Sequence, residues 1–376
     1  MKKGKVDKTF LGIVITLVLV GLATFTSASL GILAKNEVEF NNVIFSQFIL
    51  GFVGGLIAMY VGFKIPHKFL RKYSLIIFVL SILVTLLVFV PGIGLKFKGA
   101  SRWINIFGFS FQPVELLKIG FIVYFSAWLS WAKTKVKDPL FSILPLVVLI
   151  GTIGAILVNQ PDTKSIILMT TTALIMLFIS GANIKHILIF FGVAIIGFAT
   201  LVYFTPYLMD RVETFINPNA NSQTTSYQLQ QSLIAIGSGG ISGRGLGQSI
   251  QKFNYLPEPQ GDSIFAVIGE ELGFIGSAFL VLLYLAFVLR GYRIAIRNAP
   301  DSFSKLLVIG FVTIITAQSY VNIASSIGVF PLTGVPLVFI SHGGTALLLS
   351  MGMMGVVLNI SRFQNKNHIS DKVNNN

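Results

Sequence analysis

Hydrophobic residues occur in long runs that are separated by short polar stretches. Most runs hold about 20 apolar residues, the length that a helix needs to cross the hydrocarbon core of a bilayer. The pattern therefore predicts an all-α fold, a polytopic integral membrane protein with ten transmembrane helices. We place these helices at 11–33, 43–63, 73–90, 114–131, 140–158, 165–181, 184–204, 264–289, 306–330 and 337–360.

One connection is much longer than the others. It covers 205–263, between the seventh and eighth predicted helices, and a connection of this length is usually functional or carries structure of its own. Within it, 224–236 predicts an amphipathic helix that lies on the outer membrane surface. We expect one transmembrane domain over 1–363, with 205–263 as its large external loop, and a polar cytoplasmic tail over 364–376.

Composition supports the membrane class and excludes several others. Of 376 residues, 54% are hydrophobic and only 11% are charged, which does not suit a water-solvated surface. The absence of cysteine excludes disulfides and thiolate catalysis, and the four histidines have no metal-ligand spacing. The net charge of +14 indicates basic loops against an anionic membrane leaflet, and no nucleic-acid partner is expected.

The distribution of charge predicts orientation. Most of the 28 Lys and Arg residues lie in the segments between helices that fall on the same side of the membrane as the N-terminus. The positive-inside rule then places both termini in the cytoplasm. Most of the 14 acidic residues fall on the opposite, outer side. We therefore look for chemistry on the outer face.

Two stretches of the long connection are candidates for chemistry. The glycine-rich run 237–247 could bring backbone N–H groups to a phosphate or form a flexible turn, but it lacks the spacing of a nucleotide-binding P-loop. The run 251–262 ends in Asp262, immediately before a predicted helix. This carboxylate could cap the helix or act as a general base toward a sugar hydroxyl.

Ionisable residues inside predicted helices are costly to bury and commonly mark functional sites. Glu115 and Lys118 have the i,i+3 spacing of one helix face, which also fits a self-neutralising structural pair. Glu270 and Glu271 are adjacent and point in different directions, so we expect at most one to face a shared cavity.

Other outer-face residues have simpler interpretations. Arg102 precedes a tryptophan near Glu115 and suits a contact with a diphosphate or a sugar, whereas Asp162 alone predicts a turn residue. The remaining basic residues are expected to be solvated for the most part. They are Lys96, Lys98, Lys164, Arg211, Arg244 and Lys252.

The chain resembles the SEDS family (FtsW, RodA and SpoVE), and the resemblance rests on several ordered motifs. Two of its motifs, GEELG and LTGVPLVFIS, are more similar to the FtsW and SpoVE branch than to RodA. The resemblance implies a peptidoglycan glycosyltransferase that polymerises lipid II on the outer face of the cytoplasmic membrane, with a class B penicillin-binding protein. The motifs are at 100–120, 159–162, 211–218, 227–276 and 330–348.

By the same resemblance, Asp262 is the catalytic base that deprotonates the acceptor GlcNAc 4-hydroxyl. Attack on the donor's anomeric carbon then releases undecaprenyl diphosphate with inversion, giving a β-1,4 bond. Arg102 and Arg244 are assigned to the diphosphate, and a divalent cation, Mg²⁺ or Mn²⁺, is expected to be held with that diphosphate rather than by a protein metal site. The substrate-binding set is Arg102, Glu115, Lys118, Asp162, Arg244 and Lys252.

Two departures and two alternatives accompany this interpretation. Gln260 and Gly261 replace the His-Thr of many relatives, and 341–346 differs from the family's SYGGSS, so hydrogen bonding near Asp262 is expected to differ. A lipid II flippase and a non-catalytic divisome scaffold are the alternatives. A scaffold role predicts that Gly51 and Gly55 pack a partner's helix. The resemblance also implies other divisome membrane proteins as partners and a place at the division septum.

Overall fold

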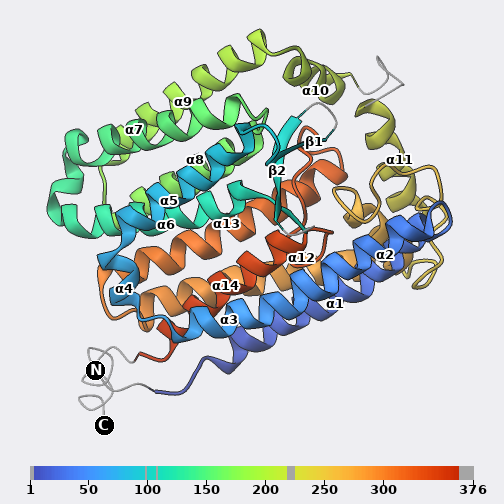
Figure 1. The fold of residues 1–376 in the computed structure, drawn as a ribbon, viewed down its shortest axis with the longest axis horizontal. Helices are drawn as coiled ribbons and strands as arrows, with labels where there is room; N and C mark the ends of the chain where they lie inside the picture. Colours follow the sequence, from blue (N-terminus) through green and yellow to red (C-terminus); the bar gives the residue numbers. More distant parts are fainter. Residues whose placement is uncertain (1–3, 98–99, 107–108, 218–224, 364–376) are drawn as a thin grey trace.

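A computed structural model describes residues 4–97, 100–106, 109–217 and 225–363; the predicted tail 364–376 lies outside them. The chain forms a bundle of long helices with one small antiparallel sheet (Figure 1). The elements are α1 (Lys8–Leu33), α2 (Glu37–Phe45), η1 (Ser46–Val53), α3 (Gly54–Lys64), α4 (His67–Lys72), α5 (Ser74–Leu86), η2 (Leu87–Phe89), β1 (Gly94–Phe97), β2 (Ala100–Ile106), β3 (Phe109–Phe111), α6 (Pro113–Ala132), η3 (Lys133–Lys137), α7 (Pro139–Val158), α8 (Thr163–Ser180), α9 (Ile184–Phe204), α10 (Pro206–Ile216), α11 (Thr225–Ser238), α12 (Ile264–Arg297), α13 (Ser302–Ser326) and α14 (Gly344–Ser361).

The predicted membrane class is confirmed. Among the described residues, 9 helices are long and apolar enough to cross a bilayer. A further predicted run, 73–90, forms the shorter apolar helix Ser74–Phe89. The protein is thus a multi-pass membrane protein, and the count of ten spans stays a prediction because this helix is shorter than the others.

The bundle has two distinct ends. At one end Gly4 donates its backbone N–H to Arg362 O (2.6 Å), so the two ends of the described chain meet there; we call this the terminal end. Arg290 of α12 binds the carboxylate of Asp7, the N-cap of α1, at 2.8 Å. The opposite, loop end carries the sheet, α10 and α11 (Figure 1).

Helix α12 is broken at Gly273, where the sequence predicts a continuous helix. Gly273 has φ +65°, and the glycine-rich run crosses the break. Arg244 N and Gly245 N donate to the carbonyls of Glu270 and Glu271, which the break leaves without helical donors. A Cβ on Gly243 would lie 2.2 Å from Glu271 O, so only glycine permits this approach. The run is thus neither a free turn nor an open phosphate cradle.

The tenth predicted helix, 337–360, also begins later than expected. Residues 337–343 are not helical: α13 ends at Ser326, α14 begins at Gly344, and 327–343 connects them. We call 327–343 the buried segment after its second half, 335–343, which is mostly buried, whereas 327–330 is largely exposed. Its carbonyls are satisfied by side chains of α13: Gln318 Nε2 donates to Pro336 O (3.2 Å) and Asn322 Nδ2 to Val335 O (2.7 Å). Burial of non-helical backbone requires such partners.

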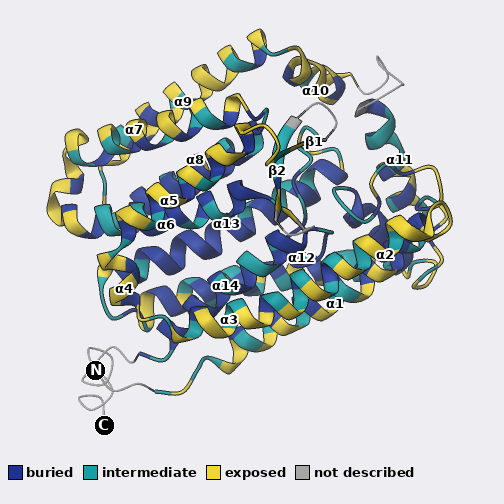
Figure 2. Ribbon diagram, viewed as in Figure 1, coloured by how far each residue is buried: buried dark blue, intermediate teal, exposed yellow. Residues whose placement is uncertain are grey.

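The α2–α3 face that a scaffold would offer to a partner is covered by the chain's own α14. A Cβ on Gly51 would lie 3.2 Å from Gly344 Cα, and a Cβ on Gly55 would lie 2.5 Å from Met351 Sδ. The expectation that these glycines pack a partner's helix is therefore wrong. Figure 2 shows the buried residues concentrated in α6, α13 and α14, at the centre of the bundle.

Helix α11 is present, as the amphipathic pattern predicts. It packs against α12, and its predicted apolar face is divided: Leu229 is 4% exposed, whereas Leu233 is 44% exposed. Ile236 fills the space above Gly269, where a Cβ would lie 2.9 Å from Ile236 Cγ1. A position on the membrane surface stays a prediction.

Candidate functional site

Asp262 lies at the loop end beside two basic residues that are distant in the sequence. A Cβ built on Gly334 of the buried segment would lie 2.9 Å from Asp262 Oδ2, 3.7 Å from Arg211 Nη2 and 3.8 Å from Lys164 Nζ. One carboxylate and two cations therefore converge within 4 Å of one point. All three residues are half-buried, so the cluster is close to the surface. We call it the Asp262 cluster.

Each member of the Asp262 cluster is held by a different element. Lys164, in the first turn of α8, donates to Gly334 O, and Arg211 of α10 donates through Nη1 to Leu332 O (2.8 Å). The N-cap position of α12 belongs to Ser263, one residue after Asp262. Asn322 Nδ2 also donates to the backbone O of Asp262 (2.8 Å). The buried segment thus joins α8, α10 and α13 at this cluster.

Gly334 is the residue that allows the cluster to close. Its φ is +64°, a left-handed conformation that favours glycine, and a side chain there would meet the Asp262 carboxylate. The motif LTGVP therefore has a physical explanation: the glycine turns the buried segment while keeping space beside the carboxylate.

Arg102 and Asp162 are brought together by the turn before α8. Arg102 Nε donates to Gln160 O at 3.1 Å and its Nη2 donates to Pro161 O, so the guanidinium holds the turn. Asp162 is 1% exposed, and its Oδ2 accepts from Ser165 Oγ at 2.9 Å. Asp162 is thus a buried residue of the turn that precedes Lys164, and its role in substrate binding stays a prediction.

Glu115 and Lys118 form the predicted pair on α6. Lys118 Nζ lies 2.8 Å from Glu115 Oε1 and donates to Gln318 Oε1 at 2.7 Å. Gln318 in turn holds Pro336, two residues from Gly334. The pair is buried and supports the buried segment, in agreement with the self-neutralising alternative. Direct substrate contact by either residue stays a prediction.

Both glutamates of the GEELG motif are buried, and their side chains bind different partners. Glu270 accepts from Ser249 Oγ (2.6 Å) and from the backbone N–H of Ile250 (3.0 Å). Glu271 pairs with Lys252 Nζ at 2.7 Å and also accepts from Ser27 Oγ of α1 at 2.7 Å. They fasten the segment before Asp262 to α12 and α1.

The two remaining basic candidates, Lys252 and Arg244, interact with these two glutamates. Lys252 is 1% exposed, and its ammonium donates to Glu271, Ser27 and Gly247 O. Arg244 is partly exposed and lies 3.7 Å from Glu270 Oε1. The structure does not place either in the Asp262 cluster, so their substrate-binding roles stay predictions, and the placement of Lys252 favours a structural role.

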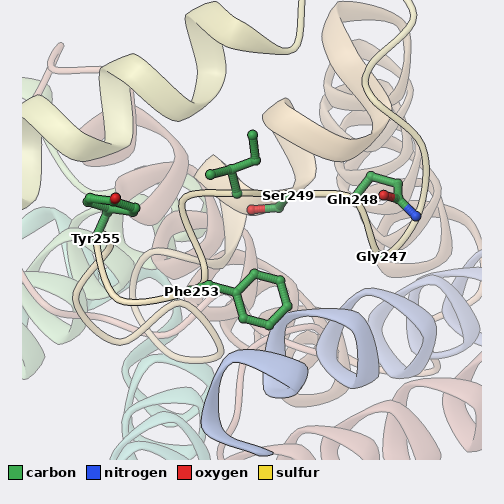
Figure 3. A pocket seen from close by; sticks show the side chains of 6 residues that line it. Gly247, Gln248, Ser249, Phe253 and Tyr255 are labelled. Carbon is green, nitrogen blue, oxygen red and sulfur yellow. The ribbon is translucent and has the colours of Figure 1, made fainter. Parts of the chain in front are cut away.

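A shallow pocket of about 260 Å³ lies on the same segment, which follows α11 and precedes α12 in the chain, and Figure 3 shows the side chains that line it. It is lined by Gly247, Gln248, Ser249, Ile250, Phe253 and Tyr255, and it does not include Asp262. Ile250 and Tyr255 are more than half exposed. The pocket is thus an apolar feature of the loop end, separate from the Asp262 cluster.

His342 of the buried segment is half-buried and packs against α1. Its ring stacks on Phe25 of α1 at 5.8 Å, and its backbone N–H donates to Gln260 O (2.7 Å). Burial lowers the pKa of His342 to about 4, an effect that the nearby Glu258 carboxylate partly opposes. The imidazole is therefore neutral at pH 7, and it helps to fix the segment that leads into Asp262.

The described residues do not form a protein metal site. No three His, Asp or Glu side chains gather in a way that could hold an ion within them. Around Gly334, the nearest neighbours of the Asp262 carboxylate are two cations, an arrangement that does not suit a Mg²⁺ or Mn²⁺ cage. The charge that the cluster can neutralise is that of an anionic ligand.

Sequence reasoning missed Lys164 and Arg211, which it assigned to the solvated outer residues. Lys164 lies two residues after the NQPD turn and Arg211 begins the RVETFINP motif, so both were adjacent to motifs already singled out. No periodicity joins α8, α10 and the buried segment, and only the tertiary fold brings them together.

The family model described as "Cell cycle protein", FtsW/RodA/SpoVE, matches residues 7–366. The chain is 35% identical over 366 residues to "Stage V sporulation protein E" of Bacillus subtilis (strain 168), covering 96% of this chain and 99% of that protein. It is 38% identical over 313 residues to "Probable peptidoglycan glycosyltransferase FtsW" of Geobacter sp. (strain M18), covering 83% and 84%.

Two solved structures have a similar fold. Thermus thermophilus RodA superimposes with a TM-score of 0.70 at 23% identity, covering 96% of this chain and 98% of that one. A chain of the structure titled "Structural coordination of polymerization and crosslinking by a peptidoglycan synthase complex" has a TM-score of 0.79 at 24% identity, covering 95% and 98%. The likeness extends over nearly the whole described bundle.

Proposed function

The chain belongs to the FtsW/RodA/SpoVE family, and from this premise we propose that it is a peptidoglycan glycosyltransferase that polymerises lipid II. A relative at 38% identity carries the name of that activity. The observation that carries the proposal is the Asp262 cluster: one carboxylate and two cations at the loop end of a membrane-embedded bundle. A sugar acceptor needs a base, and a diphosphate leaving group needs positive charge.

In the proposed reaction, Asp262 accepts the proton of the acceptor GlcNAc 4-hydroxyl. The hydroxyl oxygen forms a bond to the donor's anomeric carbon while the bond from that carbon to the phosphate oxygen breaks. The bonding electrons leave with undecaprenyl diphosphate, and attack from the opposite face inverts the anomeric centre to β.

Lys164 and Arg211 are proposed to bind the diphosphate of the donor. Two cations beside one carboxylate leave an excess of positive charge near Gly334, which suits an anionic leaving group. We also propose that a divalent cation, Mg²⁺ or Mn²⁺, is held with this diphosphate rather than by a protein cage, where it would screen the charge of the leaving group.

Orientation and assembly follow from the same proposal. Lipid II polymerisation on the outer face requires the loop end to face outward and both termini to face the cytoplasm, in agreement with the basic terminal end. We also propose a class B penicillin-binding protein as partner, other divisome membrane proteins nearby, and a septal location. The support is the name FtsW among the relatives.

The proposal is tested by incubating the purified full-length protein with fluorescently labelled lipid II and a divalent ion, with and without the class B partner. We expect a ladder of glycan strands on a gel. No ladder with the partner present, from protein that is monodisperse and thermally stable, would overturn the proposal in favour of a lipid II flippase or a divisome scaffold.

Substitution of Lys164 tests the assignment to the diphosphate. We expect Lys164→Gln to lower kcat/KM for polymerisation by about 100-fold, because one preorganised donor to a developing anion is worth this much. Arg211→Gln should act similarly, and Arg211→Lys should retain part of the activity. Lys35→Gln, in the exposed turn after α1, is the control. Unchanged kinetics in both cluster variants would contradict the assignment.

A further inference from the structure

A groove between α6 and α7 lies away from the Asp262 cluster. Its volume is about 300 Å³, and its walls are Tyr124 and Trp128 of α6 and a row of α7 side chains that includes Leu144 and Val148. Leu144 is 52% exposed and Val148 58%, so the groove opens outward from the bundle. For a multi-pass membrane protein, an outward apolar groove faces lipid chains.

The groove is built by a proline. Pro145 lies inside α7 and has no N–H, so the carbonyl of Phe141, four residues earlier, loses its helical donor. Trp128 Nε1 donates to this Phe141 O at 3.0 Å. The indole therefore lies across the α6–α7 gap with its edge satisfied, and the groove is preformed rather than closed by side-chain packing.

The mouth of the groove carries both aromatic and basic residues. Helix α6 starts at the loop end, after β3, so its last residue and the following η3 lie at the terminal end (Figure 1). Trp131 there is 58% exposed and tilts against Trp128, with ring centroids 5.2 Å apart. Exposed tryptophans are typical of the membrane–water interface.

Three exposed lysines of η3 stand at this mouth: Lys133, Lys135 and Lys137. Lys135 Nζ lies 5.1 Å from the centroid of the Phe141 ring, directly above the groove. Asp138 is the adjacent acid, and its carboxylate caps α7 by accepting from Leu140 N at 3.0 Å. The mouth therefore carries net positive charge over an apolar, lipid-facing groove.

We infer that this groove is a binding site for an anionic phospholipid. One acyl chain lies between α6 and α7 against Trp128, and the headgroup phosphate binds the η3 lysines. Basic pockets between helices select anionic headgroups in this way, and each lysine near the surface increases the affinity about fivefold. The inference concerns a site distinct from lipid II polymerisation and does not depend on that function.

Quenching of tryptophan fluorescence by brominated lipids tests the site. The sequence has 3 tryptophans, and two of them, Trp128 and Trp131, are at the groove. The full-length Trp103→Phe protein is reconstituted in phosphatidylcholine vesicles, and brominated phosphatidylglycerol or brominated phosphatidylcholine is added at equal mole fractions. We expect the apparent association constant of phosphatidylglycerol to be about 25-fold higher, because the three lysines less Asp138 leave two net positive charges at about fivefold each. Equal quenching by both lipids would overturn the inference.

A charge-matched pair of variants separates the site from general attraction to a basic surface. The triple variant Lys133→Gln, Lys135→Gln and Lys137→Gln should lose the preference for phosphatidylglycerol. A second triple variant replaces Lys64, Lys68 and Lys72 with Gln; these lysines are exposed at the terminal end but do not line the groove. This variant should keep the preference for phosphatidylglycerol. Retention of the preference in the η3 variant, or equal loss in both, would contradict a site at this groove.

Discussion

Asp262→Asn is expected to abolish glycan polymerisation while leaving the fold intact. Asparagine keeps the shape of the side chain but cannot accept the acceptor hydroxyl's proton, and loss of a general base costs about 100- to 10,000-fold in rate. The product ladder from labelled lipid II should therefore disappear. Thermal stability should stay close to that of the wild type, because the hydrogen bond between Asn322 and the backbone carbonyl of residue 262 remains.

Asp210→Asn is the matched control for this substitution. Asp210 is exposed on α10, beside Arg211 in the sequence, and it is not among the three atoms nearest to a Cβ on Gly334. It should polymerise lipid II at the wild-type rate. Robust polymer from Asp262→Asn would remove the carboxylate from the mechanism, whereas equal losses in both variants would point to a general effect of charge at the loop end.

The helical pattern was predictable because burial in lipid leaves few alternatives to a helix. Without water, backbone polar groups must be satisfied within the segment, so a run of about 20 apolar residues is nearly sufficient. The exceptions occur where side chains replace the helical bonds. Residues 337–343 are not helical, because side chains of other elements satisfy their backbone: Tyr284 donates to Val338 O, and Gln47 donates to Ser341 O and accepts from Gly343 N.

The break in α12 illustrates a second limit. Gly269 and Gly273 have the GxxxG spacing of helix packing, and close approach is the role of Gly273 in the structure. The neighbour is not another helix but the glycine-rich run, whose N–H groups replace the missing helical donors. Sequence alone identifies the small residues, whereas the partner depends on a contact some thirty residues away that no local pattern encodes.

The candidate site was predictable only in part, for the same reason. Asp262 could be named because it ends a proline-bounded stretch immediately before a helix and belongs to a motif of the resembled family. Lys164 and Arg211 carry no such mark, since a basic residue on an outer face is ordinarily solvated. Their convergence at Gly334 depends on the tertiary course of the buried segment, in which the sequence predicts helix at 327–330 and 337–343 and a connection at 331–336.

Lys252→Met is expected to destabilise the protein strongly. Lys252 and Glu271 form a buried ion pair at 2.7 Å, with both side chains at most 2% exposed. Removal of one partner leaves an uncompensated buried charge, which costs about 3–5 kcal/mol. We expect the Tm in detergent to fall by roughly 10 °C. Lys35→Met, at an exposed position of the loop end, should leave the Tm unchanged.

The double variant Lys252→Met, Glu271→Leu decides between two roles for this lysine. It removes both charges, so the Tm should recover most of the loss, since an apolar pair can replace a buried ion pair at little cost. If the pair only fastens the segment that leads to Asp262, lipid II polymerisation should recover together with the Tm. A stable but inactive double variant would instead support the predicted contact between Lys252 and the substrate, and would contradict the structural role that its three buried acceptors indicate.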